Sequence, residues 1–195
     1  QQPQEILPYF EQLSTLIAAK GDSIGVPKNT NFVNLMQLNS LRANGVGNIK
    51  LSDTAIVNKV LNSDLAKKLR PTNLKYSQFV WGYKPEANDE NNLVLYAIRG
   101  NINQKAVKTA KVNYDEMRRV VVDMQMDSKG SKDWKTMTGK NVNKPVAVTL
   151  DNIVYTAPNV VNEIPNGRTQ ISGNFSQQEA QDLVDVLGAG KLPAS

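Results

Sequence analysis

The 195-residue sequence contains no histidine and no cysteine. Histidine is the side chain whose charge changes near neutral pH, and it is also the commonest ligand of transition metals. Serine–histidine–aspartate triads, cysteine–histidine pairs and zinc sites built from these residues are therefore excluded. Carboxylate, serine–lysine and Mg²⁺ or Ca²⁺ chemistry remain open, but the acidic residues lack ligand spacing. We expect a protein that is not an enzyme and that uses no cofactor or structural metal.

Long apolar segments are also missing. No stretch approaches the roughly 18 consecutive apolar residues that a membrane helix needs, and no charged-then-apolar signal peptide is found. Because the chain begins at Gln1 rather than methionine, we expect a mature or excised piece. The hydrophobic content of 40% is enough for a core, and the length suits one domain. A net charge of +5 favours solubility and is not by itself a nucleic-acid signature, so we expect no nucleic-acid partner.

The last stretch, GNFSQQEAQDLVDVLGAGKLPAS, begins as a helix with a complete start signal. Ser176 and Glu179 form a capping box, in which each side chain bonds the backbone N–H of the other residue. One apolar stripe follows at helical spacing, formed by Ala180, Leu183, Val184 and Leu187. The stretch then ends in Gly-Ala-Gly-Lys-Leu-Pro, a flexible terminal segment that cannot continue the helix.

Three more helices are predicted from caps and periodicity, and the stretch of residues 31–41, whose pattern fits helix or strand, is interpreted as a further short helix. The first runs from Pro8 to Lys20. The second follows Asp53 as its N-cap and either continues to Pro71 or restarts at Ser63 as a separate short helix. The third follows Ser128 as its N-cap and extends to about Thr138.

The strands are predicted from alternating apolar residues and turn signals. We expect a short strand at about residues 49–51 and longer ones at residues 77–83, 93–99, 118–126, 145–150, 153–156 and 169–171. Asp151-Asn152 tolerates the positive φ angles of a two-residue turn, so the fourth and fifth strands should form a hairpin. Residues 101–113 are polar and basic and are predicted to be a loop with an edge strand at Val107. The pattern indicates an α+β fold, a two-layer sandwich of mostly antiparallel sheet covered by helices.

Phe79, Trp81 and Tyr83 share one face of the strand at residues 77–83. Two interpretations remain open for this group. The three rings either belong to the core of the sheet, or form an exposed apolar surface that binds peptides.

The second half of the chain resembles a known family. The carrying motifs are Leu150-Asp151-Asn152, Val154-Tyr155-Thr156-Ala157-Pro158, Ile171-Ser172-Gly173-Asn174-Phe175, Glu179-Ala180 with Leu183, and Gly190-Lys191-Leu192-Pro193. In this order they resemble SecD, or the SecD half of fused SecDF, of the Bacteroidetes type. The resemblance covers about Met117 to Pro193 and extends to Asp53 through DTAIVNKVL and LRPTNLKYSQFVWGYKP. Asn152 replaces the family's usual glycine, and the family's upstream D-L-x-G-G element and transmembrane segments are missing.

The resemblance implies that residues 1–195 are one soluble periplasmic domain fragment of a multi-pass inner-membrane protein. Residues 1–52 would form a helical segment that precedes the head region of residues 53–193. The terminal segment would connect the head region to a membrane helix. The implied function is non-catalytic: contact with translocating unfolded preprotein and movement during export driven by the proton-motive force. The implied partners are the preprotein and, through the full-length protein, the SecYEG translocon and SecF/YajC. Phe79, Trp81 and Tyr83 are the candidate preprotein-binding residues. The alternative is a periplasmic glycan- or lipid-binding module.

Overall fold

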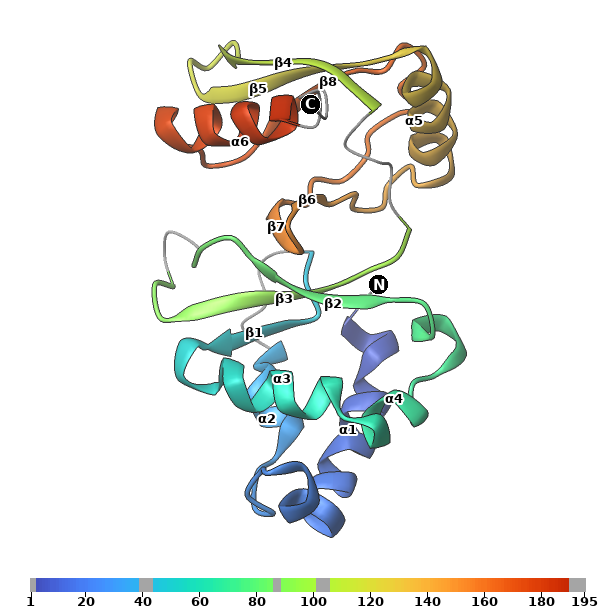
Figure 1. Ribbon diagram of the computed structural model, residues 1–195, viewed down its shortest axis with the longest axis vertical. Coiled ribbons are helices and arrows are strands. Elements are labelled where there is room, and N and C mark those ends of the chain that lie inside the picture. Colours follow the sequence, from blue (N-terminus) through green and yellow to red (C-terminus); the bar gives the residue numbers. More distant parts are fainter. Residues whose placement is uncertain (1–2, 39–43, 86–88, 101–105, 190–195) are drawn as a thin grey trace, which may run out of the picture. The chain divides into compact units, whose positions relative to one another are not determined.

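The computed structural model describes residues 3–38, 44–85, 89–100 and 106–189 (Figure 1). The chain forms two compact units, Gln1–Arg99 with Asp151–Val154, and Gly100–Leu150 with Tyr155–Ser195. Each unit has its own hydrophobic cluster. Helices combined with mostly antiparallel sheets confirm the predicted α+β class. That the whole chain acts as one domain stays a prediction.

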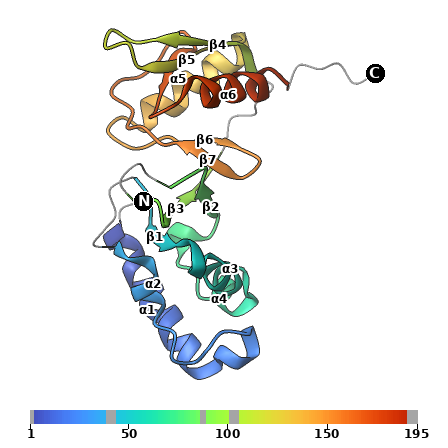
Figure 2. The same cartoon turned by 90° about the vertical axis from the view of Figure 1, so that its left-hand side faces the viewer.

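The first unit contains a helical layer. Its helices are α1 (Pro3–Lys20), α2 (Phe32–Met36), α3 (Thr54–Asn62) and α4 (Asp64–Lys68), with short 3₁₀ turns at Gly21–Ile24, Leu51–Asp53 and Thr72–Leu74. Helices α1 and α2 pack side by side (Figure 2). The buried stripe of α1 consists of Ile6, Tyr9, Phe10, Leu13 and Ile17. The helix begins at Pro3, so the predicted start at Pro8 was wrong. Pro8 lies within the helix and its side chain is exposed to solvent.

The helical layer packs on β1, β2 and β3, which belong to a sheet with the strand order β1-β3-β2-β7-β6. The strands are β1 (Gly47–Lys50), β2 (Gln78–Gly82), β3 (Asn92–Ile98), β6 (Val148–Leu150) and β7 (Ile153–Thr156). Strand β3 pairs with β1 and β2 antiparallel, whereas β2 and β7 are parallel at Trp81 and Gly82. The predicted hairpin of β6 and β7 is confirmed, since Asp151 and Asn152 both have positive φ angles, 48° and 63°. Two successive positive φ angles are what a type I′ turn requires.

The second unit contains an antiparallel sheet with the order β4-β5-β8. Its elements are β4 (Val107–Tyr114), β5 (Val120–Met126), α5 (Ser128–Lys140), β8 (Arg168–Ser172) and α6 (Gln177–Ala189). Helix α6 lies against one face of this sheet, mainly beneath β4 (Figure 1). The cluster between them is formed by Val107, Val122, Met124, Met126, Ile171, Ala180, Leu183 and Leu187.

Strand β4 corrects the prediction of a loop over residues 101–113. The edge strand expected at Val107 is confirmed, but it runs for eight residues. A β-bulge between Val107 and Thr109 shifts the register. Val107 and Ala110 therefore face the same side although they are three residues apart, and the period-2 signal of a strand is lost. Residues 101–105 lie outside the described part of the chain.

The helix caps agree with the sequence at two positions and differ at two. Ser176 Oγ accepts from Glu179 N at 3.2 Å and Glu179 Oε2 accepts from Ser176 N at 2.8 Å, which confirms the capping box. Ser63 Oγ accepts from Ala66 N at 3.1 Å and starts α4 as a separate helix. Asp53 makes no capping bond, because the 3₁₀ turn Leu51–Asp53 runs directly into α3.

At α5 the cap is Asp127 rather than Ser128, since Asp127 Oδ1 accepts from Gly130 N at 2.7 Å. None of the described helices is both long and apolar enough to span a lipid bilayer.

The cap assignment at α5 predicts a contrast between neighbouring residues. Asp127→Ala should lower the free energy of unfolding by about 1 kcal/mol, because the first-turn N–H of Gly130 loses its acceptor. Ser128→Ala should change it by less than about 0.5 kcal/mol. Urea denaturation followed by circular dichroism measures both. A larger loss for Ser128→Ala than for Asp127→Ala would contradict the assignment.

Candidate functional site

The three candidate aromatic residues lie on or next to β2, but their surroundings differ. Phe79 is half-buried and packs against the cluster of the first unit. Its ring stacks on Tyr9 with centroids 6.5 Å apart and an interplanar angle of 14°. The guanidinium carbon of Arg70 also lies over the Phe79 ring, 5.0 Å from its centroid. Phe79 thus joins α1 to the sheet as a packing residue.

Trp81 is also half-buried and is held by a polar contact. Its Nε1 donates to Asn58 Oδ1 of α3 at 3.0 Å. Its cross-strand neighbours are Leu95 on β3 and Ile153 on β7. The indole therefore combines an apolar body, packed on the helical layer, with a satisfied polar end.

Tyr83 follows the last residue of β2 and is 41% exposed. Its backbone N–H donates to Val154 O at 2.8 Å, which extends the parallel pairing by one residue. Among the three aromatics, Tyr83 offers the most accessible ring. Whether the group contacts a polypeptide stays a prediction.

Arg70 connects several elements of this region, and no motif in the sequence singles it out. Its two terminal nitrogens donate to Ser77 O at 3.0 Å and to Leu61 O at 3.3 Å, so one side chain ties α3 to the start of β2. The Tyr9 hydroxyl donates to Ala66 O at 3.1 Å and interacts electrostatically with the Arg70 guanidinium. Burial raises the pKa of Tyr9, and Arg70 partly opposes that rise.

The different surroundings predict different stabilities. Phe79→Ala should lower the free energy of unfolding by about 3 kcal/mol, because the ring packs on Tyr9 and beneath Arg70. Tyr83→Ala should cost less than about 1 kcal/mol, since much of that ring already faces solvent. Urea denaturation of both variants measures the difference. Equal losses would mean that Tyr83 belongs to the core and is a poor binding residue.

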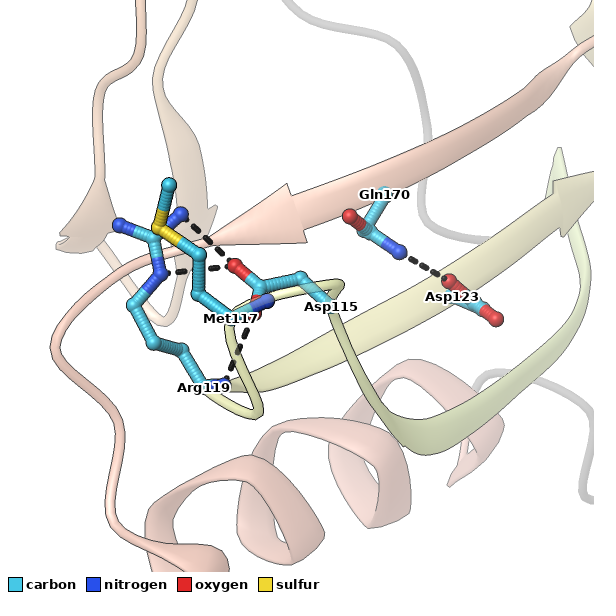
Figure 3. A network of polar contacts seen from close by, with 5 residues as sticks. All are labelled: Asp115, Met117, Arg119, Asp123 and Gln170. Carbon is cyan, nitrogen blue, oxygen red and sulfur yellow. Dashed lines mark hydrogen bonds and ion pairs between the residues drawn. The ribbon is translucent and has the colours of Figure 1, made fainter.

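A second group of polar residues orders the hairpin between β4 and β5 (Figure 3). The Asp115 carboxylate accepts from the backbone N–H groups of Met117 and Arg119 at 2.9 and 2.8 Å. It also accepts from Arg119 Nε and pairs with the terminal guanidinium nitrogen, both at 2.7 Å. The bond from the Arg119 backbone contributes most to lowering the pKa of Asp115.

The backbone of this hairpin is a three-residue turn. Arg118 N donates to Asp115 O at 2.9 Å, Asp115 N donates to Arg119 O at 3.0 Å, and Arg118 has a φ of 61°. A type I turn followed by a left-handed residue is a common three-residue hairpin connection. Arg118 stands at the position that glycine usually takes, and the Asp115 contacts hold it there. The tip exposes Tyr114 and Met117, which are 52% and 74% accessible.

A polar ladder crosses the sheet face opposite α6. Asp123 on β5 accepts from Asn113 Nδ2 on β4 and from Gln170 Nε2 on β8. Figure 3 shows the contact with Gln170, which is 3.1 Å long. The Asn113 bond contributes most to lowering the pKa of Asp123, and Gln170 and the Lys111 charge lower it further. A carboxylate with a depressed pKa is a poor proton acceptor at neutral pH. The ladder therefore ties three strands together rather than preparing a general base.

The ladder predicts how Asp123 titrates. Asn113→Ala should raise the pKa of Asp123 towards its ordinary value of 3.8, because the carboxylate loses its strongest donor. A carboxyl carbon NMR titration measures this shift. Gln178→Ala is the control, because Gln178 donates to the distant Asp182 on α6. A pKa of Asp123 that Asn113→Ala leaves unchanged would contradict the assigned contact.

The same linkage sets a pH dependence of stability. Because the pKa of Asp123 is lower in the folded than in the unfolded chain, its contribution is complete above the unfolded pKa. The contribution is lost as the pH falls through the folded pKa. Asn113→Ala should therefore lower stability at neutral pH and reduce the further loss on acidification. Urea midpoints at neutral and strongly acidic pH measure both effects.

Acidic side chains do not gather in groups of three or more that suit a metal ion within residues 3–38, 44–85, 89–100 and 106–189. That the protein needs no metal stays a prediction.

The fold and these contacts define an α+β module whose polar clusters order strands and turns. A family model described as SecDF, P1 head subdomain, matches residues 81–194. The chain therefore belongs to the SecDF P1 head subdomain family. The match begins at Trp81 and includes the whole of the resemblance found from about Met117 onwards.

Similar proteins carry consistent names. The protein translocase subunit SecD of Rhodothermus marinus is 38% identical over 147 residues, which are 73% of this chain and 23% of the relative. That of Calditerrivibrio nitroreducens is 48% identical over 73 residues, 37% of this chain and 14% of the relative. The solved structure of a membrane component SecDF that enhances protein export is 26% identical, with a TM-score of 0.46, and the match covers 72% of this chain and 57% of that one. The chain thus spans less than a quarter of the length of these curated relatives.

Proposed function

We propose that this chain is a non-catalytic periplasmic part of the Sec export machinery that contacts unfolded preprotein during translocation. The observation that carries the proposal is the match of residues 81–194 to the P1 head subdomain. The curated relatives bear the name of a protein translocase subunit. An accessory subunit of this kind handles a polypeptide rather than transforming a small substrate.

The requirements of such a contact are physical. An unfolded preprotein presents apolar side chains and unpaired backbone in no fixed sequence, so its receptor must offer partly exposed apolar surface or a sheet edge. Binding must also be weak, since the chain loses conformational freedom on contact and has to move on. The proposed contact of the first unit is Tyr83, together with Trp81 and Phe79 of β2. Tyr83 supplies the exposed ring, whereas the half-buried Trp81 and Phe79 anchor β2 to the helical layer.

The wider assembly forms part of the proposal. In the full-length protein, we expect partnership with the SecYEG translocon and SecF/YajC at the periplasmic face of the inner membrane. We also expect the head to move during export driven by the proton-motive force. Two units with separate hydrophobic clusters support movement as rigid bodies, because each retains its core when it is displaced.

An NMR titration of this chain with an unfolded preprotein segment tests the contact. We expect saturable shifts around β2, and a loss of affinity of about fivefold, near 1 kcal/mol, for Trp81→Ala and Tyr83→Ala. Tyr76→Ala is the control, because Tyr76 is 73% exposed but lies outside β2. Each variant is compared only where its spectrum remains that of the folded chain.

Two results would count against the proposal. The first is the absence of saturable shifts anywhere in the chain. The second is displacement of the segment by a periplasmic glycan or by lipid vesicles at lower concentration, which would favour a glycan- or lipid-binding module.

A further inference from the structure

Strand β4 is the longest strand at the end of either sheet. It is eight residues long, and within the part of the chain that the structure describes the order β4-β5-β8 gives it a neighbouring strand on one side only. In the first sheet the corresponding outer strands, β1 and β6, have four and three residues. An outer strand presents a row of backbone donors and acceptors that another extended chain can pair with.

The turn geometry determines which backbone groups face outwards. Asp115 N donates to Arg119 O, so this pair is hydrogen-bonded across the hairpin. Antiparallel pairs alternate between hydrogen-bonded and non-hydrogen-bonded, and the register continues without a shift from Tyr114 to Thr109. The backbone groups of Ala110, Val112 and Tyr114 therefore point away from β5. The Tyr114 N–H is taken by Asn113 Oδ1 at 2.9 Å, which leaves Ala110 and Val112 as the central donors.

The flanks of this edge offer apolar contacts. Ala110 and Val112 are half-buried and pack towards the cluster that α6 covers. Because α6 lies mainly beneath β4, an added strand would rest its inward side chains beside this helix. At the end of β4 the tip exposes Tyr114 and Met117, and Asp115 fixes their position through the contacts described above. The edge therefore provides backbone pairing in the middle and apolar side chains at one end.

The charge of β4 indicates which kind of polypeptide can pair with its outer edge. Strand β4 carries the exposed Lys108 and Lys111 and no acidic residue, and the nearest acidic residue across the ladder is Asp123 of β5, opposite Lys111. A second copy of β4 paired here would bring four lysines together, and like charges on neighbouring strands are destabilising. An extended segment of a different polypeptide meets no such repulsion, and acidic residues in it would face the lysines favourably.

We propose that the outer edge of β4 binds an extended segment of unfolded polypeptide as an added β-strand, with a preference for acidic over basic segments. This inference rests on the proposed function and assigns the contact to the second unit. It uses the recognition mode in which main-chain hydrogen bonds give affinity without a fixed sequence. This mode suits an export factor that accepts many sequences, because the backbone rather than a particular side chain is bound.

The test uses the full 195-residue chain and two synthetic ten-residue peptides, in which valine alternates with glutamate in one and with lysine in the other. With the glutamate peptide we expect saturable NMR shifts along β4, and slower amide hydrogen exchange at Ala110 and Val112. The lysine peptide should bind at least about fivefold more weakly at low salt, with the difference reduced at high salt.

Val112→Pro is the decisive variant, because it removes an outward N–H while leaving the bonds to β5 in place. It should weaken binding at least tenfold. Val112→Ala is its matched control. It shortens the side chain more than the proline variant does but keeps the backbone N–H, so it should bind peptide within about threefold of the unmodified chain. If Val112→Pro fails to fold, the hydrogen-exchange measurement on the unmodified chain decides alone.

The outcomes separate this inference from the proposed function. Saturable binding with shifts at Trp81 and Tyr83, and unchanged exchange at Ala110 and Val112, would overturn the β4 assignment and leave preprotein contact standing. No binding of either peptide or of a preprotein segment would overturn both. Concentration-dependent dimers that protect Val112 without peptide would show that the occupant is a second copy and would overturn the inference.

Discussion

The packing of α6 against one face of the β4-β5-β8 sheet is the constraint on which the second unit depends. Leu183 on α6 and Val122 on β5 are both fully buried between these layers. Burying an aliphatic side chain of this kind stabilises a fold by roughly 1.5–3 kcal/mol. Because this face is fixed inwards, the ladder through Asp123 must lie on the opposite face. The same packing leaves the long edge of β4 beside α6.

Much of the fold could be predicted where the signal is local. The capping box of Ser176 and Glu179 requires only residues three positions apart. The turn at Asp151-Asn152 was predictable because both residue types tolerate positive φ. The bulge in β4 hid that strand, because it broke the alternation on which the prediction relies. Asp127 was missed because Ser128, an equally good cap by residue type, directly follows it.

The candidate sites were less predictable because they depend on register. Asn113, Asp123 and Gln170 are 10 and 47 residues apart along the chain and meet only once three strands are aligned. The alternation of Phe79, Trp81 and Tyr83 correctly indicated a strand. It did not reveal that Tyr9, Asn58 and Arg70 occupy the surroundings of the first two rings. Neither interpretation therefore holds for all three rings. Phe79 and Trp81 pack against the core, and Tyr83 is the exposed member of the group.

Site-specific photo-crosslinking to a stalled preprotein, in the full-length translocase subunit, tests most directly whether this chain handles unfolded polypeptide. A photoreactive side chain at Tyr83 or Tyr114 should cross-link to the preprotein while it is being exported. The same group at Tyr76, which is more exposed than either residue (73%, against 41% for Tyr83 and 52% for Tyr114) but lies outside both proposed surfaces, should cross-link little. Cross-links of equal yield at all three positions, or at none of them, would contradict the account.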